Sequence, residues 1–179
     1  MIFTETKLKG AFVIDLERHE DDRGYFARTF CAREFAEHSL ETEFVNTNAS
    51  YSAQKGTLRG MHFQHPPHAE VKLVRCTRGA IYDAIIDLRP GSETYGEWIG
   101  VELSRENGRM LYVPRGFAHG FLTLSDDVDV TYQVSAFYTP GAEGGLRYDD
   151  PAFGVEWPGS IVVISDKDRM WPLVEPASS

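Results

Sequence analysis

A histidine beside other polar side chains, a lysine and a tyrosine are the residues of this sequence best suited to chemistry. His62 lies close in sequence to His65, His68 and Glu70. Imidazole and carboxylate groups at such short spacing can bind a metal ion. The alternative is proton transfer next to a carbonyl group, which needs a base, a cation beside the enolate oxygen and an acid. His62, Lys72 and Tyr132 supply residue types for these three roles, since histidine titrates near neutral pH.

Two segments that begin with glycine contain the histidines of most interest. The first, GTLRGMHFQ, runs over 56–64, and the second, GRMLYVPRGFAH, runs over 108–119. The second has the spacing Gly-x5-Pro-x-Gly-x2-His and resembles a signature of the cupin superfamily. The first resembles the partner signature, Gly-x5-His-x-His, except that Gln64 replaces the second histidine. The resemblance implies a cupin barrel with a pocket but no metal ion, in which the side chains of His62 and its neighbours carry out the reaction.

The composition narrows the class of protein. The chain has 179 residues, of which 42% are hydrophobic and 25% charged, and this suits one globular domain over 1–179 with a substantial core. A formal net charge of -9 argues against a general nucleic-acid binder, which needs a basic face. The N-terminus lacks the pattern of a secretion signal, and the apolar stretches are too short to span a membrane. Cys31 and Cys76 are expected to be free thiols, so the cytoplasm is the expected location.

Alternation of apolar and polar residues predicts many β-strands. Residues 97–103 alternate, and so do residues 127–138, where Tyr132 and Tyr138 share the apolar face. Both tyrosines are therefore expected to point into the barrel. Lys72 shares its parity with Val74 and Cys76 and is also expected to point inward, where a lysine is rare without a partner or a function.

Short strands separated by glycine, proline and aspartate predict a β-sandwich or a barrel. The cupin-like segments select an all-β double-stranded β-helix, the jelly roll or cupin barrel, with a few short peripheral helices. One helix is expected over 32–38. The last five residues are expected to form a loose tail.

A closer resemblance extends over nearly the whole chain. It is carried by six stretches, 22–26 (DRGYF), 57–64 (TLRGMHFQ), 72–75 (KLVR), 112–121 (YVPRGFAHGF), 149–151 (DDP) and 165–168 (SDKD). In their order and spacing they are similar to the dTDP-4-dehydrorhamnose 3,5-epimerase family, which are metal-free cupins. The resemblance implies an isomerase that acts without cofactor or metal on dTDP-4-keto-6-deoxyglucose or a similar nucleotide sugar, by removing protons next to its C4 ketone.

The resemblance also implies a catalytic role for four residues. His62 matches the base, and Asp168 matches the carboxylate that hydrogen-bonds and orients it. Lys72 matches the cation beside the C4 oxygen of the sugar. Tyr132 matches the acid that returns a proton from the opposite face, which inverts the carbon. From local sequence alone, Tyr132 could equally be a core aromatic residue and Asp168 a helix cap.

The substrate-binding residues follow from the same resemblance. Arg59 and His119 match groups that hold the diphosphate or the sugar, Tyr138 matches an aromatic residue that stacks on thymine, and Arg23 matches an arginine delivered by the neighbouring subunit. Further substrate contacts match Arg28, Asn46, Thr47, Asn48, Glu143 and Lys167. The family pattern implies a homodimer in which an N-terminal strand crosses to the partner. The alternative without a binding role is that Arg23 and Arg59 form surface ion pairs.

Several positions depart from the common family pattern and leave the sugar open. These are Arg28, Thr47, Glu70 with Val71, and Gln133, which stand where Glu, Asp, Gln-Gly and Lys are frequent. The main alternative is a mono-epimerase that inverts only C3 or C5, or a ketoisomerase. Two others are a metal-dependent cupin with His62, His65 and His119 as ligands, and a cupin that binds a sugar without catalysis.

Overall fold

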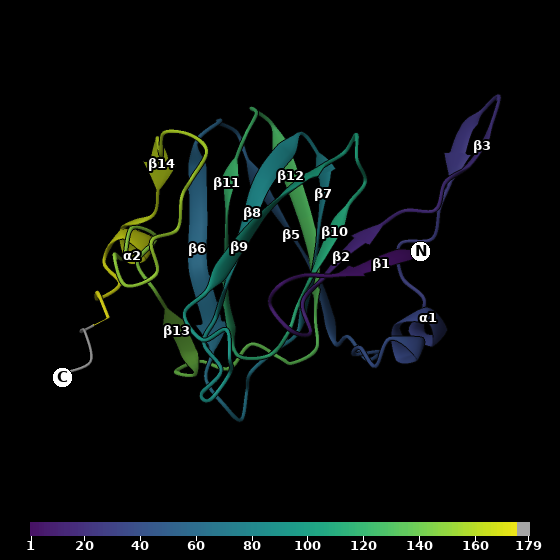
Figure 1. The fold of residues 1–179 in the computed structure, drawn as a ribbon. Helices are drawn as coiled ribbons and strands as arrows, with labels where there is room; N and C mark the ends of the chain where they lie inside the picture. Colours follow the sequence, from purple (N-terminus) through teal and green to yellow (C-terminus); the bar gives the residue numbers. More distant parts are fainter. Residues whose placement is uncertain (175–179) are drawn as a thin grey trace.

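The computed structural model describes residues 1–174, and most of its regular structure is β-strand (Figure 1). The predicted tail over 175–179 lies outside the described residues. The first sheet has six strands in the order β1 (Ile2–Glu5), β2 (Phe12–Asp15), β10 (Met110–Val113), β7 (Lys72–Arg78), β12 (Val128–Val134) and β5 (Asn46–Ser52). The second has the order β13 (Glu143–Gly145), β6 (Thr57–Gln64), β11 (Phe117–Thr123), β8 (Ala80–Asp87) and β9 (Trp98–Ser104).

The remaining elements lie outside these two paths. The short strand β14 (Val163–Ile164) pairs in parallel with β6, whereas the neighbours within each sheet are antiparallel. A hairpin of β3 (His19–Asp21) and β4 (Gly24–Phe26) projects away from the body (Figure 1). The helices are α1 (Ala32–Glu37) and α2 (Asp166–Arg169), so the predicted jelly roll with short peripheral helices is confirmed.

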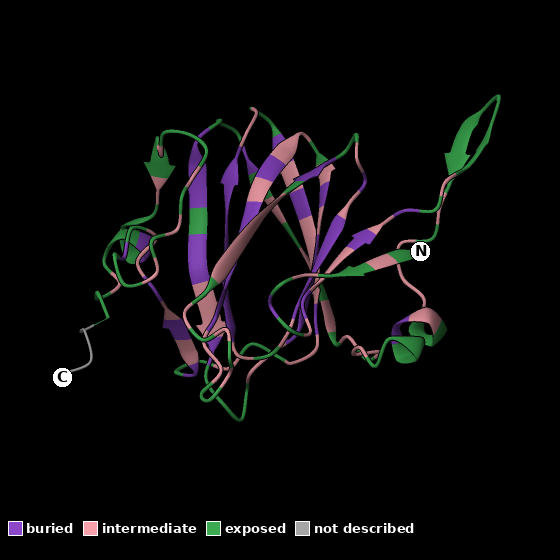
Figure 2. Cartoon of the chain, viewed as in Figure 1, coloured by how far each residue is buried: buried purple, intermediate pink, exposed green. Residues whose placement is uncertain are grey.

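The main core lies between the two sheets. Side chains from both contribute to it, for example Val74 of β7 and Leu111 of β10 from the first sheet and Ile85 of β8 and Phe121 of β11 from the second. Figure 2 shows buried positions along the strands that face this interior. Burial of each large aliphatic side chain contributes about 1.5–3 kcal/mol, so this cluster is a principal source of stability.

The outer faces of the sheets are covered by the two ends of the chain. On the first sheet, Phe35 of α1 is fully buried in a cluster with Ile14 and Met110. On the second sheet, the segment after β13 places Leu146 and Trp157 in a cluster with Ile86. The second sheet and its covering segment thus hold the C-terminal part of the chain, including α2, beside β6 (Figure 1).

The alternation predicted for the strands holds in most places. Strand β9 directs Ile99, Val101 and Leu103 toward the main core, as the pattern over 97–103 predicted. Lys72 is buried with Val74 and Cys76, as predicted. The prediction for Tyr138 was wrong, because β12 ends at Val134 and Tyr138 is 63% exposed. Beyond the strand, the chain bonds a side chain instead of a strand partner: Gln64 accepts from the Thr139 amide and donates to the Phe137 carbonyl.

Strand β6 contains one residue more than its partner β11 between two aligned pairs. His62 is opposite His119 and Arg59 is opposite Phe121, so three steps on β6 match two on β11. The extra residue of such a β-bulge shifts the alternation of side chains between the two faces of the sheet. It therefore lets Arg59 and His62 face the same cavity although their spacing is odd.

The glycines at the bulge explain why the two strands can approach so closely. A Cβ at Gly60, where φ is +131°, would lie 2.5 Å from the Gly120 Cα atom. A Cβ at Gly120 would lie 2.8 Å from the Arg59 carbonyl oxygen. Both contacts are too short for any side chain, so this crossing requires glycine on both strands.

Candidate active site

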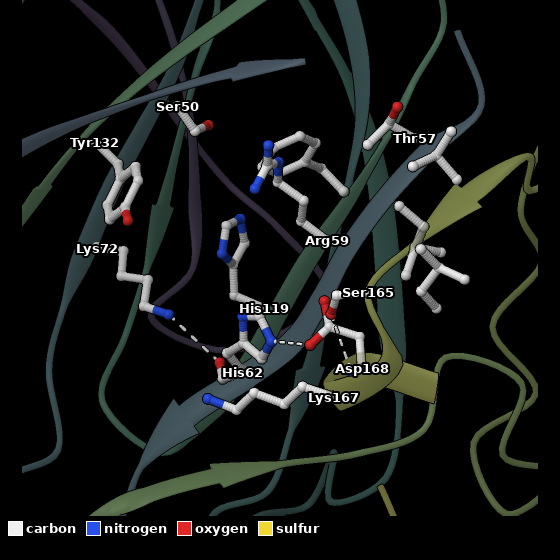
Figure 3. A pocket seen from close by; sticks show the side chains of 14 residues that line it. Ser50, Thr57, Arg59, His62, Lys72, His119, Tyr132, Ser165, Lys167 and Asp168 are labelled. Carbon is white, nitrogen blue, oxygen red and sulfur yellow. Dashed lines mark hydrogen bonds and ion pairs between the residues drawn. The ribbon is translucent and has the colours of Figure 1, made fainter. Parts of the chain in front are cut away.

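A cavity of about 500 Å³ lies between the two sheets, next to α2 (Figure 3). The second sheet contributes Arg59, His62 and His119 to its wall, and the first sheet contributes Lys72 and Tyr132. The helix α2 adds Asp168 and Lys167. Seven of the residues selected from the sequence therefore line one cavity, although they come from five separate elements.

His62 and Asp168 form a tight pair at the side of this cavity. The Nε2 atom of His62 lies 2.5 Å from Asp168 Oδ1. The imidazole is 34% exposed, whereas the carboxylate is almost fully buried. A carboxylate partner places the ring proton on Nε2, so Nδ1 carries the lone pair. The Nδ1 atom makes no hydrogen bond with any of residues 1–174, and it is free to accept a proton.

The Asp168 carboxylate is held in its ionised form. Burial opposes its ionisation most strongly, but the hydrogen bond and charge of His62, with the Gly60 and Ser165 hydrogen bonds, outweigh it and lower the pKa of Asp168. The Gly60 amide donates to Oδ2 at 3.3 Å. The ionised carboxylate therefore accepts the His62 hydrogen bond and fixes the orientation of the ring.

The position of Asp168 depends on a helix cap. Ser165 is the N-cap of α2, and its Oγ atom accepts a hydrogen bond from the Asp168 amide at 3.1 Å. The cap is therefore Ser165, and Asp168 lies inside the helix with its side chain turned toward β6. This arrangement ends the local alternative that Asp168 is itself a cap.

Lys72 reaches the cavity from β7 in the opposite sheet. Its Nζ atom lies 3.3 Å from Glu70 Oε1 and 3.4 Å from the His62 carbonyl oxygen. Its side chain is only 10% exposed, so the ammonium group is compensated by these protein oxygens more than by water. A compensated ammonium group beside His62 can stabilise negative charge that develops on a bound ligand.

Tyr132 faces the cavity from β12, on the same sheet as Lys72. Burial raises the pKa of its phenol most, the Glu70 charge raises it further, and Arg59 has a smaller opposite effect. The hydroxyl makes no hydrogen bond within residues 1–174. A phenol that stays protonated and has no protein partner can donate its proton to a ligand.

Arg59 and His119 supply positive or hydrogen-bonding character to the same wall. Arg59 donates to the Tyr51 carbonyl at 2.9 Å and to Ser52, and it forms no ion pair with an acidic group among the described residues. His119 Nε2 lies 2.8 Å from Asp83 Oδ1. Sequence reasoning missed Asp83, which is fully buried on β8, because no local motif links it to His119.

A second cavity, of about 300 Å³, shares His62, Lys72 and Tyr132 with the first. It also contains four residues predicted to bind substrate, which are Asn46, Asn48, Tyr138 and Glu143. Lys167 of the first cavity pairs with Glu143 of the second at 2.5 Å. The three residues proposed from sequence as base, cation and acid thus lie where the two cavities meet.

Three predicted contacts lie outside both cavities. Thr47 alternates with Asn46 and Asn48 and faces the opposite side of β5. Arg28 pairs with Glu34 at 3.1 Å. Arg23 sits between β3 and β4 with its side chain 89% exposed and pairs with Asp21 at 2.6 Å. The single chain does not bring these residues to the site.

The metal-binding alternative lacks a suitable cluster in this part of the chain. Residues 1–174 contain no group of three or more histidine, cysteine, aspartate or glutamate side chains placed to hold a metal ion. His62 and His119 each bond a carboxylate, and His65 does not line the cavity.

Residues 1–174 also include no helix with the length and apolar character needed to cross a membrane.

Comparison with known proteins agrees with this geometry. The family model for dTDP-4-dehydrorhamnose 3,5-epimerase matches residues 5–175. The chain belongs to this family. The epimerase of that name from Methanothermobacter thermautotrophicus is 49% identical to it, over 97% of this chain and 95% of the relative.

Solved structures of this epimerase family have the same fold. The enzyme from Bacillus anthracis, crystallised with TDP and pyrophosphate, is 40% identical with a TM-score of 0.93, over 97% of this chain and 99% of the other. The 3,5-epimerase from Legionella pneumophila, crystallised with dTDP-4-keto-L-rhamnose, is 38% identical with a TM-score of 0.90, over 96% and 92%. The jelly roll and the family expected from the sequence are confirmed.

Proposed function

We propose that this protein epimerises a dTDP-4-dehydro-6-deoxyhexose at C3 and C5, as an isomerase of dTDP-L-rhamnose-type biosynthesis contained in one domain over 1–179. The observation that carries the proposal is the His62–Asp168 pair in a cavity that also exposes Lys72 and Tyr132. Family membership and the names of relatives that are 49% and 40% identical support the substrate class.

The two sides of the cavity supply the two sides of the reaction. His62 belongs to the second sheet, whereas Lys72 and Tyr132 belong to the first (Figure 3). His62 Nδ1 removes the proton from C5, the electron pair moves to the C4 oxygen, and the Lys72 ammonium group stabilises this enolate. Tyr132 then gives its proton to the opposite face of C5, which inverts that carbon. Solvent restores the proton to Tyr132 and takes one from His62, and the cycle repeats at C3.

Binding of the nucleotide positions the sugar for these steps. Arg59 lacks an acidic partner in the described chain, and with His119 it suits the diphosphate or the sugar oxygens. Tyr138 lies at the rim of the second cavity, where an exposed ring can stack on a base. We assign Asn46, Asn48, Glu143 and Lys167 to further contacts along this path. Remote binding energy of this kind holds the reacting carbon against His62.

Proton exchange in deuterated water tests the activity. With dTDP-4-keto-6-deoxyglucose, NMR should show deuterium at both C5 and C3, and a partner reductase should give the product inverted at both carbons. Exchange at one carbon only would indicate a mono-epimerase. Binding of the nucleotide sugar without any exchange would contradict catalysis altogether.

Substitution of Tyr132 separates the acid from the base. In Tyr132→Phe we expect proton exchange at C5 to continue while inversion slows by about 10²-fold, the usual contribution of a general acid. NMR can follow exchange and product formation in one sample. A variant that inverts at the wild-type rate would remove Tyr132 from the acid role.

We further propose that the protein acts as a cytoplasmic homodimer with exchange of an N-terminal segment. The hairpin of β3 and β4 projects from the body with Arg23, Tyr25 and Phe26 exposed, which suits insertion into a partner. We assign the exchanged part to this hairpin, because it extends from the body whereas β1 pairs with β2 in the first sheet (Figure 1). Both cysteines are free, as expected in a reducing compartment.

Sedimentation tests the dimer, and Arg23→Ala tests its contribution to the site. We expect twice the chain mass, and for Arg23→Ala a KM raised roughly tenfold at little changed kcat, because a phosphate contact is lost. A monomer with full activity would contradict the proposal.

A further inference from the structure

Gln64 occupies the place where the related motif has its second histidine, and its side chain is buried at 5% exposure. Both its amide nitrogen and its carbonyl oxygen have hydrogen-bond partners. The two hydrogens of its Nε2 atom are shared among three acceptors, which are Glu70 Oε2 at 2.9 Å, the His68 carbonyl at 3.1 Å and the Phe137 carbonyl at 3.3 Å. Its Oε1 atom accepts from the Thr139 amide at 2.8 Å. One amide therefore fastens the loop after β6 to the segment after β12.

Glu70 connects this amide to the lysine of the site. While one carboxylate oxygen accepts from Gln64, the other lies 3.3 Å from Lys72 Nζ. The Glu70 and Lys72 side chains are 13% and 10% exposed, so water provides little alternative solvation. In this chain the carboxylate compensates the charge of the buried ammonium group, which would otherwise be costly in this environment.

The ammonium group has only one other protein contact that fixes its direction among the described residues. This is the His62 carbonyl oxygen, at 3.4 Å, a distance that gives a weak hydrogen bond. Without Glu70, the four-carbon stem of Lys72 could take other rotamers. The carboxylate therefore determines where the positive charge stands relative to His62.

Glu70 also belongs to the cavity itself. It lines the second cavity, and its negative charge is one cause of the raised pKa of the Tyr132 phenol. A single carboxylate thus acts on both first-sheet residues of the site, through contact with Lys72 and through its field at Tyr132.

We propose that Glu70 is a positioning residue that holds the Lys72 ammonium group at the place where the enolate oxygen forms, and that Gln64 fixes Glu70 in this position. The inference deepens the proposed function, because it rests on the role proposed there for Lys72. It also gives a role to Gln64, which stands at the position of the missing second histidine. Gln64 contacts Glu70, and Glu70 contacts the Lys72 ammonium group.

A double-mutant cycle tests the proposal with the full-length protein. Glu70→Gln keeps the size of the side chain and removes its charge. We expect it to lower kcat for proton exchange at C5 about tenfold, in the range found for residues in contact, while the Kd for dTDP changes less than twofold. In a Lys72→Ala background, Glu70→Gln should have no further effect, because the lysine through which it acts is gone.

Two companion variants separate positioning from general damage. Glu97→Gln is the matched control, since Glu97 also pairs with a lysine, Lys7, at 3.5 Å, but lies outside both cavities. It should retain wild-type activity. Glu70→Asp keeps the charge on a shorter stem and should recover part of the lost kcat. If Glu70→Gln fails to fold, Glu70→Asp provides the cycle.

The crystal structure of Glu70→Gln gives a readout that does not depend on activity. We expect Lys72 Nζ to leave its position 3.4 Å from the His62 carbonyl oxygen. An unmoved lysine, or equal effects of Glu70→Gln with and without Lys72, would overturn the proposal. If the wild-type protein showed no exchange at all, the proposed function would fail instead, and the position of Lys72 in this variant would still decide whether Glu70 holds it.

Discussion

Two imidazole–carboxylate pairs lie on neighbouring strands of one sheet, and they are built differently. His62 and His119 are directly opposite each other on β6 and β11. The partner of His62 is Asp168, which arrives from α2 outside the main strands. The partner of His119 is Asp83, which lies within the sheet on β8. The carboxylate of the first pair therefore comes from a helix outside the sheet, whereas both residues of the second pair lie in the sheet.

The pairs also differ in exposure and in how well the carboxylate is bonded. The His62 ring is 34% exposed and the His119 ring only 9%. Asp168 uses both oxygens, one for His62 and one for the Gly60 amide, whereas Asp83 Oδ2 has no hydrogen-bond partner among the described residues. An accessible ring on a fully bonded carboxylate suits a base. A recessed ring held by one bond suits a fixed contact to a ligand.

Substitution of the two histidines should give the largest contrast. We expect His62→Asn to lower kcat about 10³-fold or more, because a general base is lost. His119→Asn should mainly raise KM and lower kcat less than about tenfold, because it removes a binding contact. Steady-state kinetics with a coupled reductase measures both. Equal losses of kcat in the two variants would erase the functional difference between the pairs.

Substitution of the two carboxylates, Asp168 and Asp83, should give the same contrast between kcat and KM, with smaller effects. In Asp168→Asn the amide cannot reproduce the carboxylate that orients His62, so kcat should fall about 10²-fold with little change in KM. Asp83→Asn should again act on KM, through His119. A larger loss of kcat in Asp83→Asn than in Asp168→Asn would contradict this assignment of the two carboxylates.

The stability of the Asp168 variant should depend on pH in a defined direction. In the folded protein the pKa of Asp168 lies below its usual 3.8, because the His62 bond and charge with the Gly60 and Ser165 bonds outweigh burial. The carboxylate therefore stabilises the fold above that pH, and the stabilisation is lost as the pH falls through the lowered value. Wild type should exceed Asp168→Asn by about 1–3 kcal/mol at pH 7, and by less in acid. Urea unfolding at several pH values measures this, and a constant difference would contradict it.

Much of the site could be predicted because its residues lie in regular strands. The parity of β7 correctly directed Lys72 inward, and that of β12 did so for Tyr132. The same rule failed at Tyr138, because the Gln64 side chain replaces a strand partner beyond Val134. Alternation within one segment carries no information about a competing hydrogen bond from a distant one.

The remaining features depend on contacts between distant segments. The bulge that aligns Arg59 with His62 requires β11 to approach β6 at two glycines, which no local pattern indicates. The pairing of Asp83 with His119 joins residues that are 36 positions apart. The Ser165 cap did have a sequence signal, a serine three residues before an aspartate, and this could have placed Asp168 inside a short helix.

The most direct test of the His62–Asp168 pair is solvent exchange at C5 in deuterated water, followed by NMR in wild type, His62→Asn and His119→Asn. If His62 is the base, exchange at C5 disappears in His62→Asn and continues in His119→Asn once the substrate is saturating. Exchange at the wild-type rate without the His62 imidazole would contradict the account.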